Sequence, residues 1–171
     1  KVSAHAVEAV TEVLRPLAPP PRPWMDDAPA GLNSALDVFV GYVMLDAWIA
    51  NQDRHHENWG ALRDGEGLWL APTFDHGASM ARNLSDDERH ERMTTRDTNR
   101  HISAFARRAR SAFYGSSQAT RPLTTVAAWR AFADLAPIAA QRWLSQLAGI
   151  DDSTVENLLL QVPPSRMSTL C

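Results

Sequence analysis

The most apolar stretch of the chain covers residues 36–50, with the sequence LDVFVGYVMLDAWIA. On a helix of 3.6 residues per turn, these apolar side chains fall on every side rather than on one stripe. Asn33 and Ser34 precede the stretch and are candidate N-caps. A helix that is apolar all round is a buried helix, so the pattern predicts a central helix over 36–50. The polar residues that follow would then emerge from the middle of the domain.

The N-terminal residues have a different pattern, in which one apolar stripe alternates with polar positions. This pattern predicts an amphipathic helix over residues 3–15 that ends at Pro16. Residues 16–29 then contain six of the eleven prolines of the chain. Because proline has no N–H and clashes inside a helix, this segment can be neither helical nor a central strand. We expect a linker or an extended surface loop here.

Residues 59–63 and 68–74 have the composition of two short strands, and the turn-forming sequence DGEG at 64–67 joins them. The remaining pattern is helical, so the fold class expected is mainly α with one small β-hairpin. Further helices are predicted over 85–93 with a Ser85–Glu88 capping box, over 102–114 with Gly115 as C-cap, over 126–136, over 138–147 after Pro137, and over 155–161 capped by Ser153 with Glu156.

Composition limits the class of protein. A chain of 171 residues with 44% apolar and 22% charged residues can form one soluble globular domain. No run approaches the roughly eighteen apolar residues of a membrane-spanning helix, and no signal peptide is seen. The one cysteine, Cys171, permits no internal disulfide, so a cytoplasmic location is expected. The net charge of −3 argues against direct nucleic-acid binding.

Charge is distributed unevenly. Residues 82–110 contain eight of the sixteen arginines but only five acidic residues. Such a segment is typical of solvated helices that carry salt bridges. A docking surface for an acidic substrate is the second interpretation.

Candidate chemistry follows the apolar stretch directly. Asp53 is followed five positions later by Asn58, and Asp75 comes after the predicted hairpin. Carboxylate and amide oxygens are hard donors that suit Mg²⁺ held jointly with phosphate groups. Phosphoryl-transfer enzymes present a hydroxyl-orienting carboxylate and two oxygen ligands for magnesium in this order.

The residues around these three resemble the HipA-like serine/threonine protein kinases. The similarity is carried by YVMLDAWIANQDRHHENW at 42–59 and LAPTFDHGAS at 70–79, with shorter similarities at 111–115, 143–144 and 162–167. It extends over most of the chain from about residue 36 onward. The resemblance implies the helical C-terminal lobe of a fold related to protein kinases and phosphoinositide kinases, with the hairpin bearing the DFG-like aspartate.

The resemblance also implies roles for individual residues. Asp53 matches the catalytic aspartate, while Asn58 and Asp75 match the positions that bind Mg²⁺. His55 and Phe74 match positions that face ATP together with Asn58 and Asp75; the family usually has tyrosine in place of Phe74. His55 would orient the loop or touch phosphate, or it would only satisfy backbone groups. The implied reaction is transfer of the ATP γ-phosphoryl group to a serine or threonine hydroxyl of a protein substrate.

The N-terminal lobe of that family has no counterpart in this chain. Lys1 is the only lysine, and the eight glycines form no phosphate-binding loop. The expected organisation is therefore a helix and Pro-rich linker over 1–30 and the kinase C-terminal lobe over 31–171. Slow transfer is expected from this segment alone. Implied partners are a separate N-lobe subunit or, because the family includes toxins of toxin–antitoxin pairs, an antitoxin.

Two alternatives remain open at this stage. A kinase scaffold without catalytic activity, or one subunit of a split kinase, accounts for the missing lobe. A metal-dependent hydrolase would use His55, His56, Asp75 and His76, although no HExxH or other strong zinc spacing is present.

Overall fold

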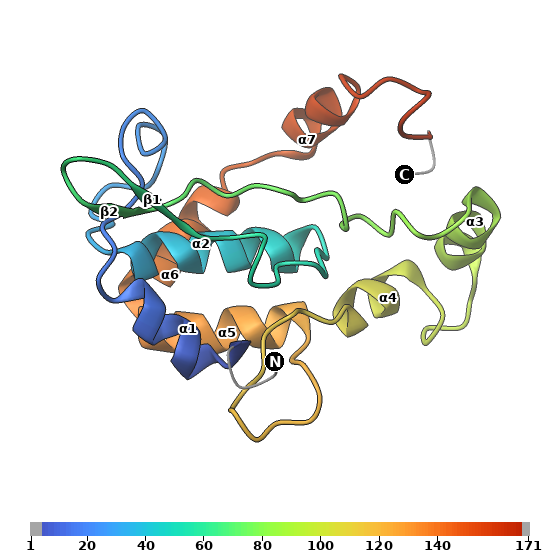
Figure 1. Ribbon diagram of the computed structural model, residues 1–171. Coiled ribbons are helices and arrows are strands. Elements are labelled where there is room, and N and C mark those ends of the chain that lie inside the picture. Colours follow the sequence, from blue (N-terminus) through green and yellow to red (C-terminus); the bar gives the residue numbers. More distant parts are fainter. Residues whose placement is uncertain (1–4, 169–171) are drawn as a thin grey trace.

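The computed structural model describes residues 5–168, which form seven helices and one two-stranded antiparallel sheet (Figure 1). The mainly helical fold with one small hairpin is therefore confirmed. The central helix is α2, and α1, α5 and α6 pack around it. The elements are α1 (Val7–Leu14), α2 (Ala35–Trp48), β1 (Ala61–Arg63), β2 (Leu68–Leu70), α3 (Asp86–Thr94), α4 (Ile102–Arg108), α5 (Thr125–Leu135), α6 (Pro137–Leu147) and α7 (Asp152–Leu159).

Helix α2 begins as its sequence predicts. Ser34 is the N-cap: its Oγ accepts from the Asp37 N–H at 3.1 Å, and the Asp37 carboxylate accepts from the Ser34 N–H at 2.9 Å. Eight of its fourteen residues are buried and only Trp48 is exposed, in agreement with an apolar pattern on every side. The helix ends at Trp48, two residues before the predicted end. Ala50 has φ +53°, in the left-handed region, and so turns the chain out of the helix.

Three phenylalanines from different segments form the centre of the core. Phe39 of α2 lies 6.0 Å from Phe113 and 5.4 Å from Phe132 of α5, and Phe113 and Phe132 are 5.1 Å apart. All three pairs meet edge to face, the arrangement that aromatic rings prefer. Because α2 carries Phe39, this cluster fixes the helix in the middle of the domain.

The segment that contains Phe113 is extended, so the predicted helix over 102–114 with Gly115 as C-cap is wrong in its second half. Helix α4 ends at Arg108. Beyond it, the Tyr114 N–H donates to His5 O at 3.0 Å, and the Leu123 N–H donates to Phe113 O at 2.8 Å. The backbone groups of this segment therefore bond to residues far away in sequence, which brings Phe113 into the core.

His5 is a core residue held in its neutral form. Its ring stacks on Phe113 at 4.8 Å, Nδ1 donates to Ala112 O at 2.8 Å, and Nε2 accepts from the Trp59 indole N–H at 3.2 Å. Burial lowers the pKa of His5. The ring therefore serves packing and hydrogen bonding between the N-terminal segment and the rest of the core.

The hairpin is shorter than predicted. Strands β1 and β2 have three residues each and pair with Ala61 opposite Leu70, whereas strands over 59–63 and 68–74 were expected. The Pro-rich segment forms turns and an extended stretch, and Ala18 in it exchanges backbone hydrogen bonds with Leu68 and Leu70 at 2.9 and 2.8 Å. Strand β2 is thereby held between β1 and the Pro-rich segment.

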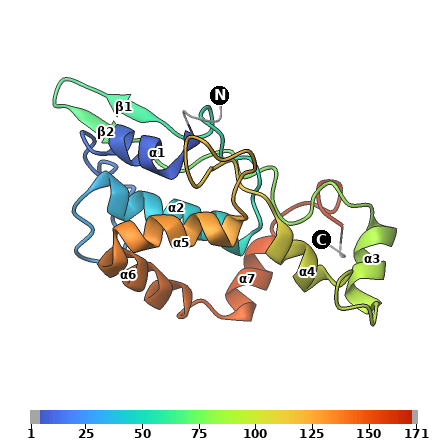
Figure 2. The same cartoon turned by 90° about the horizontal axis from the view of Figure 1, so that it is seen from below.

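Helices α3 and α4 lie at the end of the molecule away from the hairpin (Figure 1 and Figure 2). The Ser85–Glu88 capping box of α3 is confirmed. Helix α7 begins earlier than predicted, because Asp151 is its N-cap and accepts from the Thr154 N–H at 2.7 Å; the cap predicted from Ser153 with Glu156 is wrong. In the described part of the chain, no helix is long and apolar enough to cross a membrane.

The contact between α2 and α6 yields a test of the fold. A Cβ atom at Gly41 would overlap the indole ring of Trp143, whose N–H donates to Asp37 O at 2.8 Å and so holds the ring in place. Overpacking of this kind costs about 1–3 kcal/mol, which exceeds the gain of about 1 kcal/mol from alanine in a helix. We expect Gly41→Ala to lower the free energy of unfolding measured by urea denaturation.

The matched control is Gly60→Ala, because a Cβ at Gly60 would meet no atom within 4 Å. Its unfolding free energy should change by about 0.5 kcal/mol or less. Equal stabilities of the two variants would contradict the packing described for α6.

Candidate functional site

A charged residue lies inside the apolar helix α2. Asp46 is 3% exposed and Arg54, in the loop that follows, is 2% exposed. The Arg54 guanidinium donates to both carboxylate oxygens of Asp46, through Nη2 to Oδ1 at 2.7 Å and through Nε to Oδ2. Asn51 adds a third bond, from Nδ2 to Asp46 Oδ1 at 2.8 Å. The buried carboxylate is thus fully engaged by the loop that leaves the helix.

Arg54 also holds the far end of this loop. Its Nη1 donates to Asn58 O at 3.3 Å. Near the start of the loop, the Asn51 N–H donates to Asp46 O at 2.9 Å, and Asn51 Oδ1 accepts from the Asp53 N–H at 3.3 Å. Loop 51–58 is therefore fixed at both ends to the last turns of α2.

Asp53 and Asn58 lie in this one loop, as their spacing predicts. The Asn58 amide is buried and its Nδ2 donates to Asp53 O at 2.7 Å. Asn58 Oδ1 accepts no hydrogen bond from any residue in the described range. The Asp53 side chain, by contrast, is 50% exposed. The loop thus presents one accessible carboxylate next to one amide oxygen available to a ligand.

His55 is the neighbour of both residues. The His55 N–H donates to Asp53 O at 2.8 Å, and His55 O accepts from the Asn58 N–H at 3.0 Å. In the side chain, Nε2 lies 3.5 Å from Asp53 Oδ1, and Nδ1 accepts from the Glu57 N–H at 3.2 Å. His55 therefore contacts the Asp53 carboxylate and also shapes the loop through its backbone.

Asp75 lies on a second loop that is bonded to the first. The Met80 N–H donates to Ile49 O at 2.8 Å, and the Gln52 N–H donates to Ala78 O at 3.3 Å. These bonds place residues 78–80 alongside residues 49–52. Asp75 is exposed, and Phe74 before it is 42% exposed.

His76, in the Asp75 loop, is influenced electrostatically by the buried ion pair, and Tyr42 packs against Arg54. Burial lowers the pKa of His76; the positive charge of Arg54 lowers it further, while Asp46 and Asp75 act in the opposite direction. Tyr42 of α2 lies below Arg54, whose guanidinium is 5.8 Å from the ring centroid, and the Tyr42 O–H donates to Ala71 O at 3.1 Å. Burial raises the pKa of Tyr42 to about 12, so the hydroxyl remains a donor at neutral pH.

Left-handed backbone is concentrated at the Asp75 loop and at the residue that leads into loop 51–58. Within residues 5–168, the non-glycine residues with positive φ are Ala50 (53°), Asp75 (51°), Met80 (53°) and Ala81 (54°). Left-handed conformations of non-glycine residues cost energy and are found most often at functional sites. This clustering supports a functional role for the two loops.

The sequence motif pointed to Asp53, Asn58 and Asp75, but not to the buried residues that hold loop 51–58 in place. No role was predicted for Asp46, Arg54 or Asn51. A signal was available in principle, because an aspartate within an apolar helix requires a partner, and an arginine eight residues later could supply it.

The oxygen atoms of Asp53, Asn58 and Asp75 can be compared with the ligands that Mg²⁺ and Zn²⁺ prefer. Two exposed carboxylates and an amide oxygen suit Mg²⁺, which is bound by few protein oxygens together with phosphates. A zinc site requires three or four nitrogen, sulfur or carboxylate ligands in one place. No three His, Cys, Asp or Glu side chains in the described ranges are grouped so that they could hold a metal ion. His55, His56, Asp75 and His76 therefore do not form the hydrolase site considered above.

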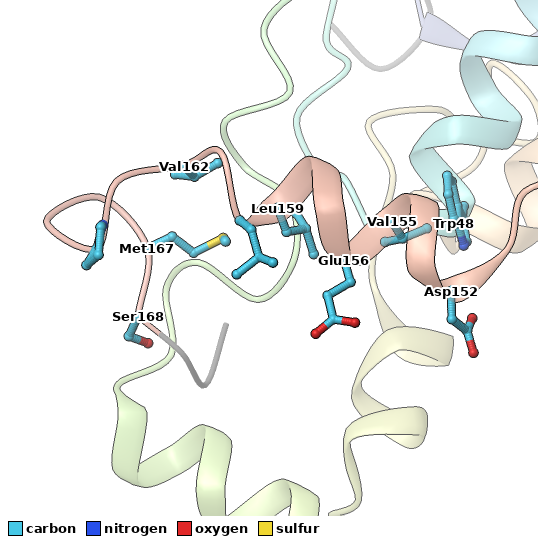
Figure 3. A pocket seen from close by; sticks show the side chains of 10 residues that line it. Trp48, Asp152, Val155, Glu156, Leu159, Val162, Met167 and Ser168 are labelled. Atoms are coloured by element: carbon cyan, nitrogen blue, oxygen red, sulfur yellow. The ribbon is translucent and has the colours of Figure 1, made fainter.

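A cavity of about 710 Å³ lies away from these loops, and none of the predicted site residues lines it. It is bordered by Trp48 at the end of α2, by α7 and by the segment after α7 (Figure 3). Its lining is mostly apolar, with Asp152 and Glu156 at one side. Size alone would favour this cavity, but the exposed carboxylates of Asp53 and Asp75 and the strained backbone near Asp75 favour loops 51–58 and 75–80.

Comparison of the chain with protein-family models, with curated proteins and with solved structures found no match.

The buried ion pair yields a test. Asp46→Asn leaves the Arg54 charge buried without a counter-charge, and breaking such a pair costs about 3–5 kcal/mol. We expect a loss of this size in the free energy of unfolding by urea denaturation. The control is Asp26→Asn, which breaks the exposed Arg22–Asp26 pair (2.8 Å) and should cost less than about 1 kcal/mol. Similar small losses in both variants would show that the Asp46–Arg54 pair does not hold the loop.

Proposed function

We propose that this chain is the catalytic-loop lobe of a HipA-like serine/threonine protein kinase, with the fold of a kinase C-terminal lobe. The observation that carries the proposal is the loop 51–58, in which Arg54 is buried against Asp46 while Asp53 is presented to solvent. A phosphoryl-transfer loop needs this combination, because its carboxylate must reach an incoming hydroxyl and still be fixed in position.

In this proposal Asp53 acts on the acceptor hydroxyl. Its carboxylate accepts a hydrogen bond from the serine or threonine O–H and takes the proton as the hydroxyl oxygen bonds to the γ-phosphorus of ATP. The bond between that phosphorus and the bridging oxygen breaks, and ADP leaves with its electron pair. His55, 3.5 Å from Asp53 Oδ1, would keep the carboxylate aligned.

Asn58 and Asp75 would hold Mg²⁺. The metal, when bound, would neutralise phosphate charge during transfer. Asn58 is oriented for this role by its bond from Nδ2 to Asp53 O, which leaves Oδ1 to face a cation. Phe74, half exposed beside Asp75, would flank the nucleotide.

A second candidate function is a kinase scaffold without catalytic activity, or one subunit of a split kinase. It is favoured by the composition, because no lysine other than Lys1 is available to pair with the α- and β-phosphates. The inactive scaffold differs from the kinase, whole or split, because it would not bind ATP in a Mg²⁺-dependent way even when an N-terminal lobe is supplied. The experiments below therefore use the natural full-length protein.

Asp75→Asn tests the metal site and preserves the left-handed backbone, which asparagine tolerates. We expect ATP affinity in Mg²⁺ to fall by about tenfold or more, equivalent to about 1.4 kcal/mol, with little change in EDTA. Isothermal titration calorimetry measures both conditions. Asp87→Asn removes the same charge from the exposed face of α3 and is the control. ATP binding that is insensitive to magnesium, or absent, would favour the scaffold.

Asp53→Asn tests the catalytic carboxylate. The amide cannot take the hydroxyl proton, so transfer of radiolabelled γ-phosphate to protein should fall by about 10²-fold or more. ATP affinity should remain within about twofold, because binding and transition-state stabilisation are separable. A variant that transfers phosphate at the normal rate would show that Asp53 is not the acceptor-binding base.

A further inference from the structure

A separate polar pocket lies beside loop 51–58. It has a volume of about 250 Å³ and is lined by Gln52, Arg92, Asn99, Phe105, Arg108 and Ala109. The lining thus combines Gln52, the neighbour of Asp53, with two guanidinium groups from the α3–α4 region. Neither the resemblance nor the proposed reaction assigns a role to these groups.

Arg92, in the last turn of α3, is held over the pocket by two contacts. Its guanidinium lies 4.9 Å from the centroid of the Phe105 ring, and its Nη1 donates to Arg100 O at 3.3 Å. Its Nε is fully buried and has no acceptor among the described residues. Because this nitrogen is shielded from solvent, a ligand in the pocket would meet Arg92 through its terminal nitrogens, of which Nη2 has no acceptor among the described residues.

Arg108, the last residue of α4, is fixed from the other side. It donates through Nη1 to Asn99 O at 3.1 Å and through Nη2 to Asn99 Oδ1 at 3.2 Å. A guanidinium has five N–H donors, so further donors remain for a ligand.

The positive charge of this pocket is not neutralised locally. Within residues 5–168, Arg92 and Arg108 form no ion pair, whereas nearby Arg89 pairs with Asp86 and Arg100 pairs with Glu91. Glu88, one turn before Arg92, interacts with it electrostatically, but its carboxylate is bonded to Ser85. The salt-bridged interpretation of the 82–110 segment therefore holds for Arg89 and Arg100, but not for the two arginines of the pocket.

Gln52 joins this charge to the proposed catalytic loop. Its Oε1 accepts from the Arg110 N–H at 3.4 Å, while no described residue accepts from its Nε2. Its backbone N–H bonds to the Asp75 loop at Ala78 O. Asp53 is the next residue, with Cα atoms about 3.8 Å apart. A group bound by Gln52, Arg92 and Arg108 would thus lie close to a hydroxyl bound at Asp53.

We infer that this pocket binds an oxyanion on the protein substrate, either a phosphoserine phosphate or an aspartate or glutamate carboxylate, a few residues from the acceptor hydroxyl. Forked guanidinium donors match both groups, and charge-assisted hydrogen bonds are the stronger ones. The identification of the ligand as part of a kinase substrate rests on the proposed function. The affinity of the pocket for an oxyanion does not.

The test uses three small probes and needs no ATP. Blocked phosphoserine, blocked aspartate and blocked serine (N-acetyl, N-methylamide) are titrated into ¹⁵N-labelled protein, and the side-chain amide signals of Gln52 and Asn99 are followed by NMR. Phosphoserine should shift both signals saturably, and serine should not. Aspartate binding as tight as phosphoserine binding identifies a carboxylate as the natural ligand, and weaker binding identifies a phosphate.

Variants assign the binding to the pocket. Arg108→Gln should weaken phosphoserine binding about tenfold. Arg107→Gln removes the same charge from the neighbouring position of α4, does not line the pocket, and should weaken it less than about twofold. Gln52→Ala, which removes no charge and leaves α3 and α4 unchanged, should also weaken it and serves as a second variant if Arg108→Gln disturbs the fold.

Equal weakening by Arg107→Gln and Arg108→Gln, or equal binding of blocked serine and phosphoserine, would overturn the inference. Asp53→Asn should retain the binding. If it does so while phosphate transfer is also unaffected, the oxyanion pocket stands and the proposed catalytic role of Asp53 fails. If Asp53→Asn abolishes transfer but the parent protein does not bind blocked phosphoserine, the catalytic role of Asp53 stands and the oxyanion pocket is rejected.

Discussion

The buried pair of Asp46 and Arg54 is the interaction on which the candidate site depends. Burying two charges costs solvation free energy, which their mutual attraction does little more than offset. Such pairs therefore add little net stability to the fold. What this pair provides is position, because the three side-chain nitrogens of Arg54 bond to the helix at Asp46 and to the loop at Asn58 O together. An apolar replacement could fill the same volume but could not hold the loop at both ends.

The position of that pair is itself determined by the aromatic core. Phe39, Phe113 and Phe132 fix α2, and Asp46 lies two turns after Phe39 on the same helix. From Asp46 the restraint passes to loop 51–58, and from Ile49 and Gln52 to the loop that carries Asp75. Each step is a packed ring or a hydrogen bond of the backbone or a buried side chain. The exposed carboxylate of Asp53 and the loop that carries Asp75 are thus attached to the buried core.

Features that depend on neighbouring residues could be predicted from the sequence, whereas features that depend on residues far apart in the chain could not. The cap at Ser34, the Ser85–Glu88 box and the DGEG turn are set by residues within four positions, and they were predictable. Residues 109–114 have the apolar spacing of a helix, but their backbone partners are His5 and Leu123, so the local pattern was misleading. In the site, the exposed Asp53 and the buried Asn58 were visible as a motif. The pairing of Asp46 with Arg54 was not, because the apolar pattern shows that a buried charge needs a partner but not which charge it meets.

Helices α2 and α3 are held in place by different interactions. Helix α2 is buried in the core, whereas α3 has no buried residue and is attached through polar contacts and the stacking of Arg92 on Phe105. Regions with few buried apolar contacts are the ones that open most easily. An oxyanion bound between Gln52 on the rigid loop and Arg92 on α3 would link these two parts, and its binding energy would stabilise the docked position of α3. In the proposed kinase, the substrate segment that occupies the pocket would thereby also complete the wall of its own binding site.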